Sequence, residues 1–226
     1  MAELTESGSG FLTSEGIKSA LESGRLVITP LLEESQIGQA SIDLRLGSEI
    51  LVMKQTQKAF INPVELTPQT ARNIQGPVNL AIGIPFILHP GQLILGVTLE
   101  YISLGLDLCG MILSRSRFGR TGLIVATASF IHPGWKGCLT LELCNAGVLP
   151  LFLYCGSPIA QLAVANAYPP LENQPQALIP TRPRLAEMSK MIDWSKLKKF
   201  QGIWEQQGSF LTSTATSLNS DNKKKE

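Results

Sequence analysis

Apolar residues near the start of the chain recur at helical spacing. Three of them share one face of a helix: Ile17, Ala20 and Leu21. Thr13 or Ser14 can cap that helix, and Gly24 is placed to end it. The chain begins MAELTESGSG, which is small and polar and has little apolar surface to bury. We therefore expect a flexible leader over residues 1–12 and a folded domain from residue 13.

From Arg25 the apolar pattern changes from helical spacing to alternation. Residues 41–47 read SIDLRLG, in which every second residue is apolar. Three side chains face one way on such a strand: Ile42, Leu44 and Leu46. Asp43 and Arg45 face the other way, so this segment predicts a strand with one polar face.

Further short apolar runs follow, and Pro-Gly, Gly or Asn-Ala-Gly turns separate them. They cover residues 86–89, 92–99, 111–113, 123–127, 138–143, 149–154 and 159–163. Short strands at this spacing are typical of an all-β sandwich or barrel. No long helical pattern alternates with them, which argues against a doubly wound parallel sheet.

The last part of the chain has a different composition. Residues 169–187 are rich in proline and predict a loop, and residues 188–200 could form a short helix. The Ser/Thr-rich end, which finishes in KKKE, predicts a disordered tail over residues 208–226. A chain of 226 residues can bury a large core, so we expect one domain over residues 13–207.

Charge and cysteine content limit the classes of partner. The formal charge is +1, from 19 basic and 18 acidic residues, which argues against nucleic acid or a membrane surface as a partner. The 4 cysteines lie in apolar strand-like runs, a pattern that favours reduced thiols and a cytoplasmic setting. Residues 143–171 contain no charged side chain, but prolines and glycines divide them into lengths that suit strands.

Three arginines and two serines take five of the seven positions from Ser114 to Arg120. Guanidinium groups and hydroxyls suit the oxygens of a triphosphate, because they form charge-assisted and bidentate hydrogen bonds. A set of salt bridges at a subunit interface would use the same residues. The spacing alone leaves both interpretations open.

One carboxylate stands in the middle of an apolar strand, in the segment CLTLELCN at 138–145. Alternation places Thr140, Glu142 and Cys144 on the face opposite to the leucines. An unpaired buried carboxylate destabilises the fold. Glu142 should therefore meet an arginine, reach solvent in a cleft or have a raised pKa. The last two arrangements suit a general base, and the first is an equally good structural alternative.

Between these two segments, residues 127–137 read TASFIHPGWKG. The Pro-Gly pair predicts a turn that could present a backbone carbonyl and a polar side chain to a ligand. His132, one of 2 histidines, stands at this turn. A histidine beside a turn is more often a surface or packing residue than a catalytic one.

The order of these segments resembles that of the dCTP deaminase family, within the dUTPase-like superfamily. RSRFGRTGL at 115–123, ASFIHPGW at 128–135 and LTLELCN at 139–145 look like the family's RSSLARLGL, IDPGW and LELxN segments. Flanking segments also match: SIDLRLG at 41–47, LHPG at 88–91, VTLE at 97–100 and GSPIAQL at 156–162. The resemblance runs in order from about residue 16 to 167, whereas KFQG at 199–202 only partly resembles the family's lid.

This resemblance implies a distorted jelly-roll-like β-barrel of the dUTPase-like type, with a short N-terminal helix and a C-terminal lid. It implies a homotrimer with active sites between subunits. It also implies hydrolytic deamination of dCTP to dUTP and ammonia without zinc, with Mg²⁺ bound through the substrate triphosphate. Inhibition by dTTP is left open.

The resemblance also implies roles for individual residues. Glu142 would be the base that activates the hydrolytic water. Ser116 and the backbone carbonyl of Ala128 would position that water near C4 of cytosine, and Arg120 would stabilise the charge that develops there. The positions expected to bind the substrate are Arg115, Ser116, Arg117, Arg120, His132, Thr140, Glu142, Gln161 and Lys199.

Two positions depart from the family's pattern. Arg117 stands where a serine is usual, and it could add phosphate affinity or crowd the pocket. His132 replaces the aspartate that the family places under the deoxyribose 3′-hydroxyl, and an imidazole can still donate or accept one hydrogen bond there. An imidazole beside three phosphates should favour its protonated form, which cannot accept a proton from water. We therefore expect the reaction to stop at dUTP.

Three alternatives compete with this interpretation. A zinc-dependent cytidine-type deaminase needs H-x-E and P-C-x-x-C segments, and the chain contains neither. A non-catalytic deoxynucleotide sensor could use the same scaffold, because a fold does not fix a function. A bifunctional enzyme that also removes diphosphate from dUTP is the third.

Overall fold

The computed structural model describes residues 10–54, 60–65, 73–168 and 170. Its helices are α1 (Ser14–Glu22), η1 (Glu34–Gln36), η2 (Pro63–Glu65) and α3 (Ser116–Gly119). Its strands are β1 (Leu26–Thr29), β2 (Ile42–Met53), β3 (Gln75–Asn79), β4 (Phe86–Leu88), β5 (Leu93–Leu104), β6 (Leu108–Ser114), β7 (Leu123–Val125), β8 (Phe130–Ile131), β9 (Lys136–Asn145), β10 (Leu151–Leu153) and β11 (Pro158–Asn166).

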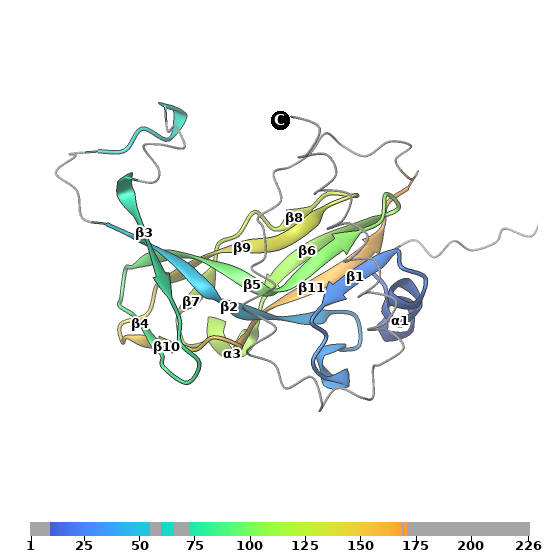
Figure 1. Ribbon diagram of the computed structural model, residues 1–226, viewed down its shortest axis with the longest axis horizontal. Coiled ribbons are helices and arrows are strands. Elements are labelled where there is room, and N and C mark those ends of the chain that lie inside the picture. The colour runs from blue at the N-terminus through green and yellow to red at the C-terminus, as the bar shows by residue number, and fades with distance from the viewer. Residues whose placement is uncertain (1–9, 55–59, 66–72, 169, 171–226) are drawn as a thin grey trace, which may run out of the picture.

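Most of the described strands form one curled antiparallel sheet in the order β7-β9-β5-β2-β11-β6-β8. β1 pairs with β5 and β3 pairs with β2, while β4 and β10 form a separate ribbon. Figure 1 shows α1 beside β1 at one end of the sheet and the β4–β10 ribbon at the other. The architecture confirms the prediction of an all-β, distorted jelly-roll-like barrel with a short N-terminal helix.

The N-terminal helix forms where the apolar spacing predicts it. Ile17, Ala20 and Leu21 are buried, and Gly24 follows the helix with a φ of 72°, a left-handed conformation that glycine adopts readily. Thr13 occupies the N-cap, but its side chain makes no capping hydrogen bond. The first N–H of the helix, that of Ser14, donates instead to the carbonyl of Gln39 at 2.7 Å.

Residues 10–12, which precede the predicted domain boundary at residue 13, pair with β11. The N–H of Leu12 donates to the carbonyl of Val164 at 2.7 Å, and Phe11 pairs with Ala165 in an isolated β-bridge. Residues 10–12 therefore pair with the C-terminal end of β11, although the sequence pattern placed them in the leader. The rest of that leader, the predicted helix at 188–200 and the tail at 208–226 lie outside the described residues.

Alternation sets the two long strands that matter for the site. On β2, Ile42, Leu44 and Leu46 are fully buried, as predicted. On β9, Leu141 and Leu143 are fully buried and Thr140 is exposed. β2 and β5 each run several residues beyond their predicted ends, and β1, β3 and β8 were not predicted, because their runs are short or interrupted by polar residues.

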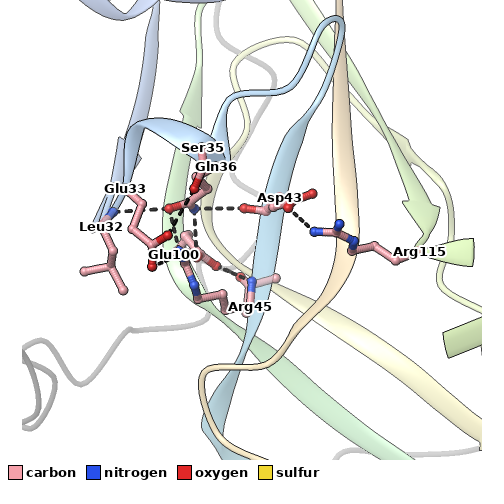
Figure 2. Close-up of polar contacts among 9 residues, drawn as sticks. Leu32, Glu33, Ser35, Gln36, Asp43, Arg45, Glu100 and Arg115 are labelled. Atoms are coloured by element: carbon pink, nitrogen blue, oxygen red, sulfur yellow. Dashed lines mark hydrogen bonds and ion pairs between the residues drawn. The ribbon is translucent and has the colours of Figure 1, made fainter. Parts of the chain in front are cut away.

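Three buried polar side chains form a cluster around Arg45 of β2: Gln36, Arg45 and Glu100. Figure 2 shows the Glu100 carboxylate between the other two side chains. Its Oε2 accepts the backbone N–H of Arg45 at 2.8 Å, and its Oε1 accepts Nε2 of Gln36 at 3.0 Å and Nη1 of Arg45 at 3.4 Å. The face predicted to be polar is therefore polar, but at Arg45 it is covered by protein.

Candidate active site

The arginine-rich segment forms a tight turn at the end of β6. Arg115 is the N-cap of α3, and the N–H groups of Gly119 and Arg120 donate to the carbonyls of Arg115 and Ser116, each at 3.0 Å. Phe118 packs against the hydrophobic core and anchors the turn. In the same turn, the side chains of Ser116, Arg117 and Arg120 are exposed to solvent, and that of Arg115 is half-buried.

Three strands bring Arg115 and Gln161 to the same carboxylate. β11 lies between β2 and β6, with Gln161 opposite Asp43 on one side and Leu113 on the other. Nε2 of Gln161 donates to Oδ1 of Asp43 at 3.1 Å, and Nη1 of Arg115 donates to Oδ2 of Asp43. Asp43 was not among the site residues predicted from the sequence. Its position on the polar face of SIDLRLG was the signal that could have found it.

The carboxylate of Glu142 lies on β9, between β7 and β5. The backbone of Glu142 is fixed by two hydrogen bonds, from its N–H to Oγ1 of Thr127 at 3.1 Å and from the Ala126 N–H to its carbonyl at 2.8 Å. Its Oε2 is buried and makes no hydrogen bond with any described residue. No ion pair joins Glu142 to an arginine in the described part of the chain, so the structural Glu–Arg pair is not formed there.

Residues 126–129 connect the two halves of the candidate site. β7 pairs with β9 and β8 pairs with β6, so the segment between β7 and β8 closes the curled sheet. One end is bound to Glu142 through the N–H of Ala126, and the other end is bound to Ile112, whose N–H donates to the carbonyl of Ser129 at 2.7 Å. Ala128 lies between these two attachments and is exposed. None of the described residues donates to its carbonyl.

The turn after β8 forms as the Pro-Gly pair predicts. Gly134 has a φ of 77°, and the N–H of Trp135 donates to the carbonyl of His132 at 3.2 Å. The His132 side chain is exposed and meets the ring of Phe130 edge-on, with 5.1 Å between ring centroids. Lys199 lies outside the described residues, so its predicted contact with the nucleotide stays a prediction.

Six of the predicted site residues fall into two groups on either side of residues 126–129. Arg115 and Gln161 meet through Asp43, and the same turn carries Ser116 and Arg120. Glu142 lies against the segment that carries Ala128. Where the chain is described, no three His, Cys, Asp or Glu side chains gather in a way that could hold a metal ion. Equally, no helix of the described residues is long and apolar enough to cross a membrane.

Comparison with known proteins shows the family to which the chain belongs. The family model of dCTP deaminase-like proteins matches residues 11–167. This chain belongs to the dCTP deaminase-like family. A relative from Dictyoglomus thermophilum, named dCTP deaminase, dUMP-forming, is 40% identical over 163 residues, or 71% of this chain and 82% of the relative. A relative of the same name from Methanobrevibacter smithii is 36% identical over 162 residues, or 71% and 82%.

A solved structure has a related fold. The crystal structure of 2′-deoxycytidine 5′-triphosphate deaminase from Agrobacterium tumefaciens matches this dCTP deaminase-like chain with a TM-score of 0.56 at 22% identity. The match covers 70% of this chain and 48% of the other, so this chain spans about half the length of that structure. At this identity the likeness concerns the fold, and it agrees with the predicted all-β architecture.

Proposed function

We propose that this chain hydrolyses dCTP at C4 of the cytosine ring and releases ammonia. The observation that carries the proposal is the Glu142 carboxylate, whose Oε2 is buried without a hydrogen bond from any described residue. A buried oxygen without a partner is destabilising unless a ligand or water satisfies it. Membership of the dCTP deaminase-like family supports a nucleotide as that ligand.

The proposed chemistry uses a water molecule activated by Glu142. The carboxylate accepts a proton from the water as its oxygen bonds to C4, and the proton then passes to the exocyclic nitrogen. The second water proton goes to N3 of the ring, the C4–N bond breaks, ammonia leaves and the C4 oxygen becomes the carbonyl of uracil. Ser116 and the Ala128 carbonyl position the water, and Arg120 stabilises the charge that develops on the ring. Water activation in this proposal needs no zinc.

The triphosphate binds at the arginine-rich turn. Arg115, Arg117 and Arg120 lie within six positions of one another, and guanidinium forks suit phosphate oxygens. Mg²⁺ enters as part of the substrate, bound through the triphosphate. Thr140, Gln161 and His132 complete the proposed nucleotide contacts among the described residues.

The active assembly is a homotrimer, in which a neighbouring subunit supplies a second wall to each site. Support comes from the resemblance of the chain to its family and from a closed ring being the usual form of such oligomers. Light scattering should give three times the mass of one chain, and a monomer would contradict this part of the proposal. A titration with dTTP tests whether that nucleotide competes with dCTP.

The product is a separate question, and we propose dUTP. This proposal rests on His132, which stands where the family has an aspartate. A neutral imidazole offers one acceptor nitrogen to orient water at phosphorus, whereas a carboxylate offers two oxygens. The names of the Dictyoglomus thermophilum and Methanobrevibacter smithii relatives favour a second candidate, in which deamination is followed by removal of diphosphate to give dUMP. Chromatography after complete turnover of dCTP separates the two. dUMP with stoichiometric pyrophosphate would establish the second candidate.

Ammonia release from dCTP by the purified protein is the deciding experiment. We expect ammonia in equal amount to the dCTP consumed, and we expect zinc chelators to leave the rate unchanged. Loss of activity that zinc alone restores would contradict the zinc-free mechanism. Binding of dCTP without ammonia release would contradict the enzyme and favour a deoxynucleotide sensor.

A further inference from the structure

Asp43 joins two candidate substrate-binding residues, Arg115 at the N-cap of α3 and Gln161 on β11. Its carboxylate accepts Nη1 of Arg115 through Oδ2 and Nε2 of Gln161 through Oδ1. The Asp43 side chain is 18% exposed and that of Arg115 is 33% exposed. The pair is therefore partly protected from water, and a charge-assisted contact of this kind holds a side chain more firmly than a pair at the open surface does.

The backbone of Asp43 is fixed from the opposite side. Its carbonyl accepts Nε2 of Gln36 at 2.8 Å, and the same nitrogen donates to the buried carboxylate of Glu100. Figure 2 shows Asp43 between this buried cluster and the guanidinium of Arg115. Asp43 is therefore held by the core on one side while its carboxylate contacts site residues on the other.

We infer that Asp43 is a positioning residue that orients Arg115, and with it Gln161, for the phosphates of the substrate. This inference rests on the proposed function. A guanidinium has five N–H donors in a fixed plane, so holding Nη1 on Asp43 determines where the remaining donors point. No other acceptor for Arg115 side-chain donors occurs among the described residues, which leaves those donors to a ligand.

Two effects of Asp43 on a triphosphate oppose each other. Its negative charge weakens the local attraction for phosphate, whereas its contact with Arg115 fixes the donor geometry before the ligand arrives. Pre-organisation reduces the entropy lost on binding, and a misdirected fork loses bidentate contacts. We expect the pre-organisation of Arg115 to outweigh the repulsion between Asp43 and the phosphates.

The test measures dCTP affinity by calorimetry, in the presence of Mg²⁺, for Asp43→Asn, Arg115→Lys and the double variant. Asparagine keeps the shape and an acceptor for Gln161 but removes the ion pair. We expect Asp43→Asn to weaken dCTP binding about tenfold, the size expected for a misdirected charge-assisted contact. In the Arg115→Lys background the same change should have much less effect, because residues that act through one contact are not additive.

The chain contains a matched control at the opposite end of β6. Asp107 precedes this strand, and its Oδ2 accepts Nε of Arg25 at 2.6 Å, with side-chain exposures of 32% and 41%. Asp107→Asn breaks a similar Arg–Asp pair away from the site and should leave dCTP affinity within about twofold. Thermal melting of every variant measures any loss of stability.

Asp43→Glu provides a second variant that keeps the charge on a longer side chain. It should recover part of the affinity that Asp43→Asn loses. Additive effects of Asp43→Asn and Arg115→Lys, or tighter binding by Asp43→Asn, would overturn the inference. Ammonia release by the wild-type chain is measured in parallel, so binding without turnover would contradict the proposed function and leave the Asp43 result standing.

Discussion

Two glutamates on neighbouring strands of the same sheet have different surroundings. Glu100 on β5 is fully buried, and both of its oxygens accept hydrogen bonds from Gln36 or Arg45. Glu142 on β9 also has a buried oxygen, but this oxygen has no partner among the described residues. The difference teaches that burial alone does not separate a carboxylate proposed to act in catalysis from a structural one. What distinguishes Glu142 is hydrogen-bonding capacity that the described part of the chain does not use.

The pKa of Glu100 agrees with a structural role for this residue. Burial raises the pKa of Glu100 to about 7, and Arg45 opposes the rise through its backbone N–H and its charge. A perturbed pKa is often taken as a sign of a functional site, although structural networks perturb pKa values as well. Here the raised pKa belongs to the carboxylate whose oxygens are fully hydrogen-bonded. Glu100 is therefore best explained as a structural residue.

The largest expected effect comes from Glu142→Gln, which keeps the side-chain shape and removes the basic oxygen. Turnover of dCTP should fall by about 10²- to 10⁴-fold, because general base catalysis contributes on that scale. Affinity for dCTP should change only a few-fold. Glu22→Gln, an exposed change at the end of α1, is the matched control. Steady-state kinetics and calorimetry check both points, and undiminished turnover would make Glu142 a structural residue like Glu100.

The second prediction concerns the pH dependence of stability set by Glu100. Because its pKa rises from an ordinary value of 4.5 to about 7 in the folded state, the folded chain keeps this proton over a range where the unfolded chain has lost it. Its contribution to stability is thus complete below pH 4.5 and is lost as the pH rises through 7. The loss is on the order of 3 kcal/mol in the free energy of unfolding.

Glu100→Gln isolates this contribution, since glutamine does not titrate. Between pH 4.5 and pH 8 the free energy of unfolding of Glu100→Gln should rise relative to that of the wild type by that same amount. Urea denaturation of both proteins at several pH values measures the difference, in which the titration of other groups cancels. A pH-independent difference would show that Glu100 ionises normally in the fold.

The sequence predicted the face of β9 on which Glu142 lies, but it did not predict the surroundings of Glu100. The reason is that the contacts of Glu100 join residues that are far apart in the sequence. Alternation on 138–145 depends only on neighbouring residues, so it correctly placed Glu142 opposite the buried leucines. Gln36 and Glu100 are 64 positions apart, and their contact depends on how η1 folds over β2 and on how β2 pairs with β5. No local pattern encodes that arrangement.

The same limit applies to the candidate site. The motif resemblance pointed to Arg115 and Gln161 separately, because each lies in its own short segment. It did not indicate Asp43, which is 72 positions from Arg115 and 118 from Gln161 and meets both only because β11 pairs with β2 and β6. The residues proposed to bind the ligand were identified through their own segments, whereas their contact with Asp43 depends on the sheet order.

The smallest expected effect compares the two ends of β9 through their cysteines. Cys138 lies near Glu100, and burial together with the charges of Glu100 and Glu49 raises the pKa of its thiol to about 12. Cys144, two residues beyond Glu142, is half-buried. Because the thiolate is the reactive form, iodoacetamide at pH 8 should modify Cys138 at least about tenfold more slowly than Cys144. Peptide mass spectrometry over a time course measures both rates. Equal rates would mean that the Cys138 end of β9, which lies near Glu100 of β5, opens as readily as the Glu142 end. The contrast between the structural carboxylate of Glu100 and the carboxylate proposed for catalysis would then fail.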